Sequence, residues 1–133
     1  MPFEVVADAR GTVDFTVTLK TASGGYLQIA ADDVVRVKIG RGKDTTPDLD
    51  LSSAAASANK SSVTVDELGD GSATHAQVTV RLAQGDTASL WGSYGVLVGL
   101  VDNSETAPAD AFKPVEKGTL HVVPSLAGGV GLT

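Results

Sequence analysis

The chain has 133 residues, of which 42% are hydrophobic but only 5% aromatic, and it carries a formal charge of -6 at pH 7. This acidic balance argues against nucleic-acid binding, which relies on clustered lysine and arginine. The chain contains no cysteine, which excludes disulfides, zinc-thiolate sites and thiol catalysis, and no stretch approaches the roughly 20 apolar residues of a membrane span. We therefore expect one domain with neither a nucleic-acid nor a membrane partner.

The first ten residues lack the basic region and apolar run of a secretory signal, because Glu4 and Asp8 interrupt the apolar positions. We interpret residues 1–10 as an N-terminal arm or an edge strand. Its apolar side chains are candidate anchors for a protein interface; they are Phe3, Val5 and Val6.

Three apolar runs follow in the first half of the chain. Residues 13–19 alternate apolar and polar positions over seven residues, which predicts a strand with one buried face. A glycine-containing turn at residues 23–25 then precedes a short strand or strand-like return at 26–29. Residues 35–39 alternate apolar with basic positions, which predicts a half-exposed antiparallel strand.

The middle of the chain contains a predicted hairpin between small-residue segments. Leu49 and Leu51 indicate a brief strand after Pro47. Residues 52–62 are rich in serine and alanine, and we interpret them as a mobile loop with one helical turn possible at 54–56. Residues 63–65 and 78–82 then form the two strands of a hairpin around Gly69–Gly71.

The last third contains two more predicted strands. Residues 94–101 carry apolar side chains on both faces, which predicts a central strand that is covered on both sides. A long loop over residues 102–117 leads to a last strand that begins after Gly118 and ends at Pro124. Residues 125–133 are glycine-rich, and we expect a flexible C-terminal tail.

About seven to nine short strands result, spaced by roughly ten residues and punctuated by glycine, proline and aspartate. This spacing predicts an all-β fold, an immunoglobulin-like antiparallel β-sandwich over residues 11–124, with a jelly roll as the alternative.

No catalytic motif is present. His75 and His121 are the only histidines, and we interpret both as surface residues because no G-x-S-x-G nucleophile elbow accompanies them. The loop acids could offer oxygen ligands to calcium but lack the spacing of an EF-hand, so we expect no metal and no other cofactor. These acids are Asp32, Asp33, Asp44, Asp48 and Asp50.

Two features carry a docking hypothesis. We interpret residues 40–43 as a hairpin turn and not a phosphate-binding loop, because no helix follows. The only basic cluster of the chain lies around this turn and predicts either a contact with an acidic protein surface or a solvated strand face. The basic cluster consists of Arg36, Lys38, Arg41 and Lys43.

The lone Trp91 predicts a core plug at one end of the sandwich, with a binding hot spot as the alternative.

Four segments carry a family resemblance: SSVTV at 61–65, AQVTVRL at 76–82, GSYGV at 92–96 and VDNSET at 101–106. In these segments the chain resembles small bacteriophage virion proteins, namely the immunoglobulin-like N-terminal domain of baseplate upper proteins and related head-fibre or decoration proteins. The similarity covers residues 13–123. It implies a structural module without enzymatic activity, present as lattice-bound copies or a homo-oligomer in the virion. The implied partner is the major capsid protein or another virion protein.

The chain ends at Thr133 without the fibre extension of longer relatives, so we expect a capsid decoration or cement protein. A tail or baseplate adaptor, a head-fibre base and a carbohydrate-binding sandwich module are the alternatives. The loop before the last strand and the tail offer apolar residues for adhesion, although an ordinary sheet-to-sheet crossover explains the loop equally well. The candidate residues are Pro108, Phe112, Pro114 and Leu126.

Overall fold

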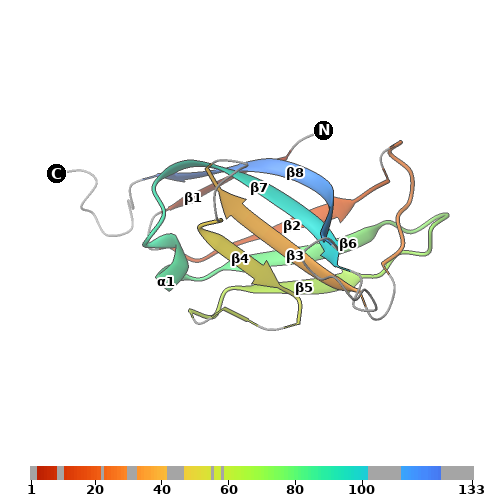
Figure 1. The fold of residues 1–133 in the computed structure, drawn as a ribbon, viewed down its shortest axis with the longest axis horizontal. Coiled ribbons are helices and arrows are strands. Elements are labelled where there is room, and N and C mark those ends of the chain that lie inside the picture. Colours follow the sequence, from red (N-terminus) through yellow and green to blue (C-terminus); the bar gives the residue numbers. More distant parts are fainter. Residues whose placement is uncertain are drawn as a thin grey trace.

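In a computed structural model of the chain, two β-sheets pack face to face (Figure 1). The larger sheet has the order β1-β8-β7-β3-β4, and the smaller has the order β2-β6-β5. The structure describes residues 3–8, 11–21, 23–29, 33–41, 47–54, 56–57, 59–101 and 112–123. The elements are β1 (Phe3–Asp8), β2 (Val13–Leu19), β3 (Val34–Gly40), β4 (Leu49–Ser52), β5 (Ser62–Glu67), β6 (Ala76–Leu82), α1 (Gln84–Thr87), β7 (Gly92–Val101) and β8 (Phe112–Val123).

The strand order is that of an immunoglobulin-like sandwich. β2, β6 and β5 correspond to strands B, E and D of that fold, and β3, β7 and β8 correspond to C, F and G. β4 extends the larger sheet beyond β3, and β1 pairs in parallel with β8, whereas the other pairs are antiparallel. The predicted all-β sandwich is therefore confirmed. No helix among the described residues is long and apolar enough to cross a membrane.

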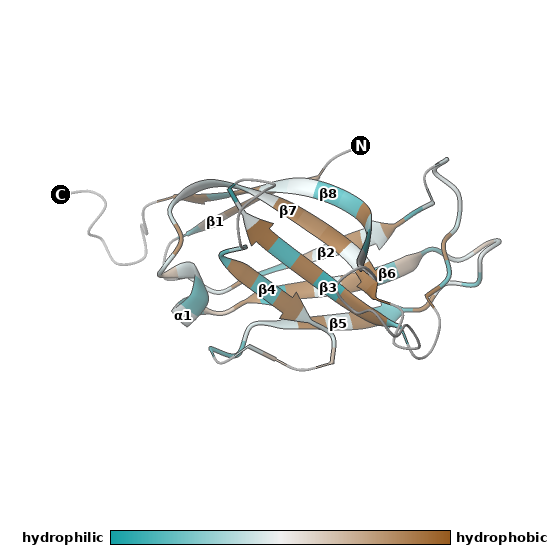
Figure 2. Ribbon diagram, in the orientation of Figure 1, coloured by the Kyte–Doolittle hydropathy of each residue, from teal (hydrophilic) through white to brown (hydrophobic). Residues whose placement is uncertain are grey.

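The core lies between the two sheets and is built from alternate residues of each strand (Figure 2). Val35, Val37 and Ile39 of β3 are fully buried, and so are the alternating apolar residues of β6. Each such side chain stabilises the fold by roughly 1.5–3 kcal/mol relative to an exposed one. The alternation in the sequence therefore identifies the inner face of most strands correctly.

The last strand is longer than predicted. β8 begins at Phe112, not after Gly118, so residues 112–117 of the expected loop are strand. Pro114 is accommodated because the β7–β8 register shifts at Val98 and Gly99, and because β1 pairs only from Gly118 onward. A bulge and a free edge are the positions where a strand tolerates proline. Pro108 and the other residues of 102–111 lie outside the described residues.

Two other predictions need correction, and one open alternative is decided. Residues 26–29 form no strand; they contribute only an isolated bridge between Tyr26 and Lys20. β7 is not covered on both sides, because Ser93, Gly95 and Leu97 on its outer face are exposed. Of the two alternatives for residues 1–10, the structure shows the edge strand at 3–8, since β1 pairs with β8, Ala7 is buried and Phe3 packs against the core.

Gly69 lies in the β5–β6 turn. Of the glycines in turns, it is the one where an added side chain should destabilise the fold most. Its φ is +78°, and an added Cβ would lie 2.4 Å from the carbonyl oxygen of Leu27. We expect Gly69→Ala to lower the free energy of unfolding by about 2 kcal/mol, from the left-handed backbone and from the displaced neighbour. Gly71→Ala is the control, since its φ is +79° but its Cβ has no neighbour closer than 3.9 Å. If urea denaturation gives the same loss in the free energy of unfolding for both variants, the close contact with Leu27 adds nothing to the cost at Gly69.

Candidate interaction site

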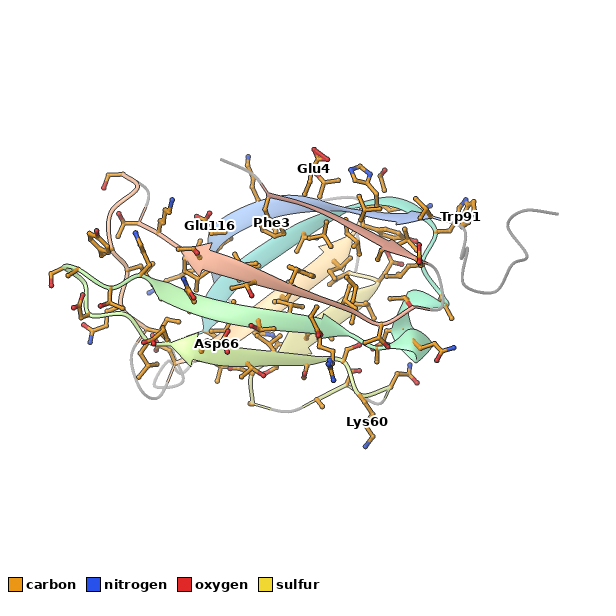
Figure 3. All side chains as sticks on the ribbon, turned by 180° about the vertical axis from the view of Figure 1, so that it is seen from behind. Phe3, Glu4, Lys60, Asp66, Trp91 and Glu116 are labelled. Atoms are coloured by element: carbon orange, nitrogen blue, oxygen red, sulfur yellow. The ribbon has the colours of Figure 1, made fainter. Side chains whose placement is uncertain are left out.

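Trp91 does not plug the sandwich as predicted; 59% of its surface is exposed. It lies at the end of the molecule where β1 and β8 finish (Figure 3). The neighbouring Leu90 is 3% exposed and occupies the core position instead. The core position between α1 and β7 is therefore filled by Leu90, and Trp91 lies at the surface.

The hydroxyl of Tyr94 fixes the backbone at Trp91. Tyr94 is the third residue of β7 and is buried, and its oxygen accepts hydrogen bonds from the Trp91 backbone N–H at 2.7 Å and from Arg41 Nη2 at 3.0 Å. The Arg41 guanidinium also lies 4.5 Å from the centre of the Tyr94 ring, within the range of a cation–π contact. This arrangement resembles the tyrosine corner of immunoglobulin-like domains. Trp91 and Arg41 together form what we call the Trp91 corner.

Removing the hydroxyl tests this anchor. We expect Tyr94→Phe to lower the free energy of unfolding by about 1 kcal/mol, because the Trp91 amide and the Arg41 guanidinium lose an acceptor while the packed ring stays. Tyr26→Phe is the matched control, since the Tyr26 ring is partly exposed and its hydroxyl has no hydrogen bond among the described residues. Equal midpoints of chemical denaturation for the two variants would mean that the Tyr94 hydroxyl anchors nothing.

A buried carboxylate supports the same end of the sandwich. Asp86 of α1 is 5% exposed and accepts hydrogen bonds from Ser57 at 2.8 Å, from Asn59 at 3.0 Å and from Ser61. Ser61 also accepts a bond from the Ala83 backbone N–H. The segment predicted as a mobile loop is therefore tied, at Ser57, Asn59 and Ser61, to the helix before Trp91.

The environment of Asp86 favours its ionised form. Burial by itself would raise the pKa of Asp86, but the hydrogen bonds from Ser61, Asn59 and Ser57 outweigh it and hold the pKa below its usual value. Its contribution to stability is therefore present above the pKa of an unfolded aspartate, which is about 3.9. That contribution is lost as the pH falls through the lower pKa of the folded state.

The outer face of the larger sheet, defined as the side away from the smaller sheet, is open. Leu97 is 39% exposed there, and Val6 of β1 is 63% exposed. Gly40 and Gly95 lie directly opposite each other in the β3–β7 register, so neither strand covers the backbone with a side chain at that point. The face is a rigid surface with exposed apolar groups at its centre and at its β1 edge.

The predicted basic cluster is divided by the structure. Arg36 pairs with Asp50 at 2.8 Å on the outer face, where both side chains are 36% exposed. Lys38 shares that face, while Arg41 belongs to the Trp91 corner and Lys43 lies outside the described residues. Of the three described members, Arg36 and Lys38 therefore lie on the outer face, while Arg41 contacts Tyr94.

The apolar candidates also separate by burial. Phe3 lies 5.9 Å from Phe15 of β2, measured between ring centres, so it joins the two sheets rather than facing solvent. Val5 also packs against the core, and Val6 is the exposed member of the three. Pro114 is exposed on β8, whereas the side chain of Phe112 and all of Leu126 lie outside the described part.

A line of three polar side chains crosses the outer face. Ser93 Oγ lies 2.8 Å from His121 Nδ1, and His121 Nε2 lies 3.4 Å from Glu4 Oε2. A serine hydrolase uses the same three kinds of group, but its serine contacts Nε2 and its acid contacts Nδ1. Ser93 also lies inside the β7–β8 ladder instead of at a strand-to-helix turn. The line links β1, β8 and β7, and His121 is at the surface as predicted.

The other end of the sandwich holds His75. It stacks on Tyr26 with 4.2 Å between ring centres, and its Nδ1 is buried without a hydrogen-bond partner among the described residues. The prediction of an exposed His75 is therefore only partly right. No three metal-ligating side chains gather within the described ranges; Asp32 and Asp44 fall outside them.

The chain was also compared with known proteins. No protein-family model matches it, and no curated protein matches its sequence. Sequence reasoning missed the Tyr94 anchor and the Asp86 network, because both depend on contacts between residues far apart in the chain. The only local signal was the polar Gly85–Thr87 stretch directly before the lone tryptophan.

Proposed function

We propose that the chain is a non-enzymatic bacteriophage virion protein that docks on the outer surface of the head as a decoration or cement subunit. The observation that carries this proposal is the Trp91 corner, an exposed tryptophan whose backbone N–H is bound to the Tyr94 hydroxyl, together with an arginine that donates to the same hydroxyl. Tryptophan and arginine are the residues most enriched among interface hot spots. The resemblance of the strand segments to virion proteins supplies the kind of partner.

The fixed backbone strengthens the argument for docking. Binding costs free energy for each side chain or loop that becomes ordered, so a preorganised anchor retains more of its contact energy. Trp91 meets this condition because the Tyr94 hydroxyl holds its amide and Asp86 holds the preceding helix to the 57–61 segment. Many copies on a lattice add avidity, so each contact can be modest.

Co-sedimentation with capsids that lack the native subunit tests the proposal. We expect Trp91→Ala to weaken binding by roughly 30-fold, the effect of truncating a hot spot of about 2 kcal/mol. Leu68→Ala is the matched control, because Leu68 is a large apolar residue that is 45% exposed at the other end of the sandwich. Undiminished binding by Trp91→Ala, or no binding by the wild-type chain, would refute the proposal.

A carbohydrate-binding module is the second candidate, and the exposure of Trp91 favours it more than the sequence did. Sugars stack on exposed aromatic rings, and Trp91 and Tyr26 are both partly exposed, at 59% and 39%. Glycan-array binding at micromolar affinity that disappears in Trp91→Ala would favour this candidate over the capsid.

A further inference from the structure

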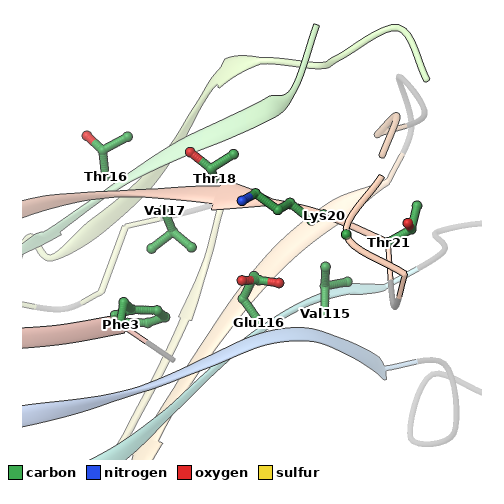
Figure 4. Close-up of a pocket in the computed structure, with 9 residues that line it drawn as sticks. Phe3, Thr16, Val17, Thr18, Lys20, Thr21, Val115 and Glu116 are labelled. Atoms are coloured by element: carbon green, nitrogen blue, oxygen red, sulfur yellow. The ribbon is translucent and has the colours of Figure 1, made fainter. Parts of the chain in front are cut away.

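The seam between the two sheets contains a hollow of about 420 Å³ at the start of β1 (Figure 4). Phe3, Val17 and Val115 give it an apolar lining, and Thr16, Thr18 and Lys20 of the β2 side line it opposite Glu116 of β8. The volume falls within the roughly 300–1,000 Å³ typical of ligand sites. Its lining contains one cation and one anion, so it favours neither sign of charge.

Two strand edges without a described neighbour border this hollow. β2 pairs only with β6, so its other edge has no strand beside it among the described residues. β8 pairs with β7 along its length, but β1 covers only the half from Gly118 to Val123. Among the described residues, no strand pairs with the β1 side of β8 from Phe112 to Lys117, and Val115 and Glu116 of this half line the hollow. Unpaired strand edges are templates for the addition of another strand.

The register of β1 shows how an added strand would run. Phe3 pairs with Gly118 in a parallel ladder, so a strand placed in line with β1 and ahead of Phe3 would run, from its N-terminus to its C-terminus, from Lys113 to Lys117. Alternate side chains of such a strand would point into the apolar lining at Val17 and Val115. Backbone pairing would supply affinity and the lining would select small or β-branched apolar residues.

We propose that this seam is a strand-addition site that takes an extended polypeptide segment of a partner protein, with alternating apolar side chains, parallel to β8 and in line with β1. The site differs from the Trp91 corner, which lies at the end of the molecule where β8 finishes. The inference does not depend on the proposed virion role, and its test uses no phage particle. The two proposals therefore fail separately.

The probe is a blocked peptide of sequence Lys-Val-Thr-Val-Thr-Val-Lys, titrated into the full ¹⁵N-labelled chain. We expect amide shift changes at residues 113, 115–117 and 16–21, and none at the free edges of β4 and β5. Two versions of the peptide, N-methylated on the valines or on the threonines, test for strand pairing. Since alternate residues of a strand direct their N–H groups to opposite edges, one version should lose about tenfold or more in affinity and the other should not.

Equal binding by the two methylated peptides would overturn the proposal, because it would indicate apolar adsorption without strand pairing. Shift changes at other edges, or none at all, would overturn it too. Val115→Lys should abolish binding, and Leu97→Lys on the outer face should not; circular dichroism confirms that each variant is folded.

Hydrogen exchange without peptide distinguishes other occupants of the seam. Slow exchange at residues 113–117 that is independent of protein concentration would mean that the chain fills its own seam. Protection that rises with concentration would mean that a second copy supplies the strand. Either result contradicts a separate partner, whereas fast exchange that slows only with peptide supports it.

Discussion

Removal of residues 1–8 is expected to lower the free energy of unfolding by about 4 kcal/mol, a large part of the 5–15 kcal/mol of an ordinary domain. The deletion takes away β1, whose six residues pair with β8 from Gly118 to Val123. It also removes buried Ala7 and the packing of Phe3 and Val5 on the core. Urea denaturation should show a lower midpoint together with a smaller m-value, because less surface is buried in the folded state.

Two substitutions keep this prediction testable if the truncated chain does not fold. Val5 packs against the core while its neighbour Val6 is 63% exposed. We expect Val5→Ser to cost about 1–2 kcal/mol and Val6→Ser less than about 0.5 kcal/mol. An unchanged midpoint after the deletion, or equal costs for the two serines, would mean that residues 1–8 are the detachable arm that the sequence allowed.

Asp86→Ala is expected to lower the free energy of unfolding by about 3 kcal/mol, because three side-chain donors lose a charged acceptor in a buried site. The substitution should also release residues 57–61 from α1, since Ser57, Asn59 and Ser61 are joined through this one carboxylate. Thermal or chemical denaturation measures the loss. Asp48→Ala is the control, because Asp48 is exposed. Comparable losses of unfolding free energy for the two variants would mean that the hydrogen bonds to Asp86 do not stabilise the fold.

The pH dependence gives a second check on Asp86. Its pKa is lowered in the folded chain, so the stabilisation is complete above the unfolded pKa and declines below it. The advantage of the wild-type chain over Asp86→Asn should therefore be constant above about pH 5 and should shrink as the pH falls below about 4. An advantage that grows on acidification would show that the carboxylate is held in its neutral form.

Residue alternation was sufficient to predict most strands and their inner faces. The β5–β6 hairpin and the antiparallel β3–β4 pair follow from apolar positions at every second residue and from the turn residues between them. These features are local, since each strand and turn is encoded within a few residues. Burial of the inner face against the other sheet then fixes the register.

Non-local pairing explains what could not be predicted. Nothing near Phe3 indicates that it pairs in parallel with Gly118, more than a hundred positions away. Leu90 and Trp91 are adjacent apolar residues, and only the fold determines which of them enters the core. Pro114 argued against a strand, although the bulge and the free edge of β8 accommodate it. The candidate site depends on contacts between residues that are far apart in the chain. Trp91 and Arg41 could therefore be proposed from the sequence, but the bonds that both make to the Tyr94 hydroxyl could not.

Hydroxyl-radical footprinting of the chain, free and bound to capsids, tests the central claim most directly, because aromatic side chains report their own exposure. We expect Trp91 to be strongly oxidised in the free chain and protected on the particle, while Tyr26 at the opposite end keeps its reactivity. Protection of Tyr26 and Leu68 with an unchanged Trp91 would contradict it, since docking would then use the end of the sandwich that carries the β2–β3 and β5–β6 connections.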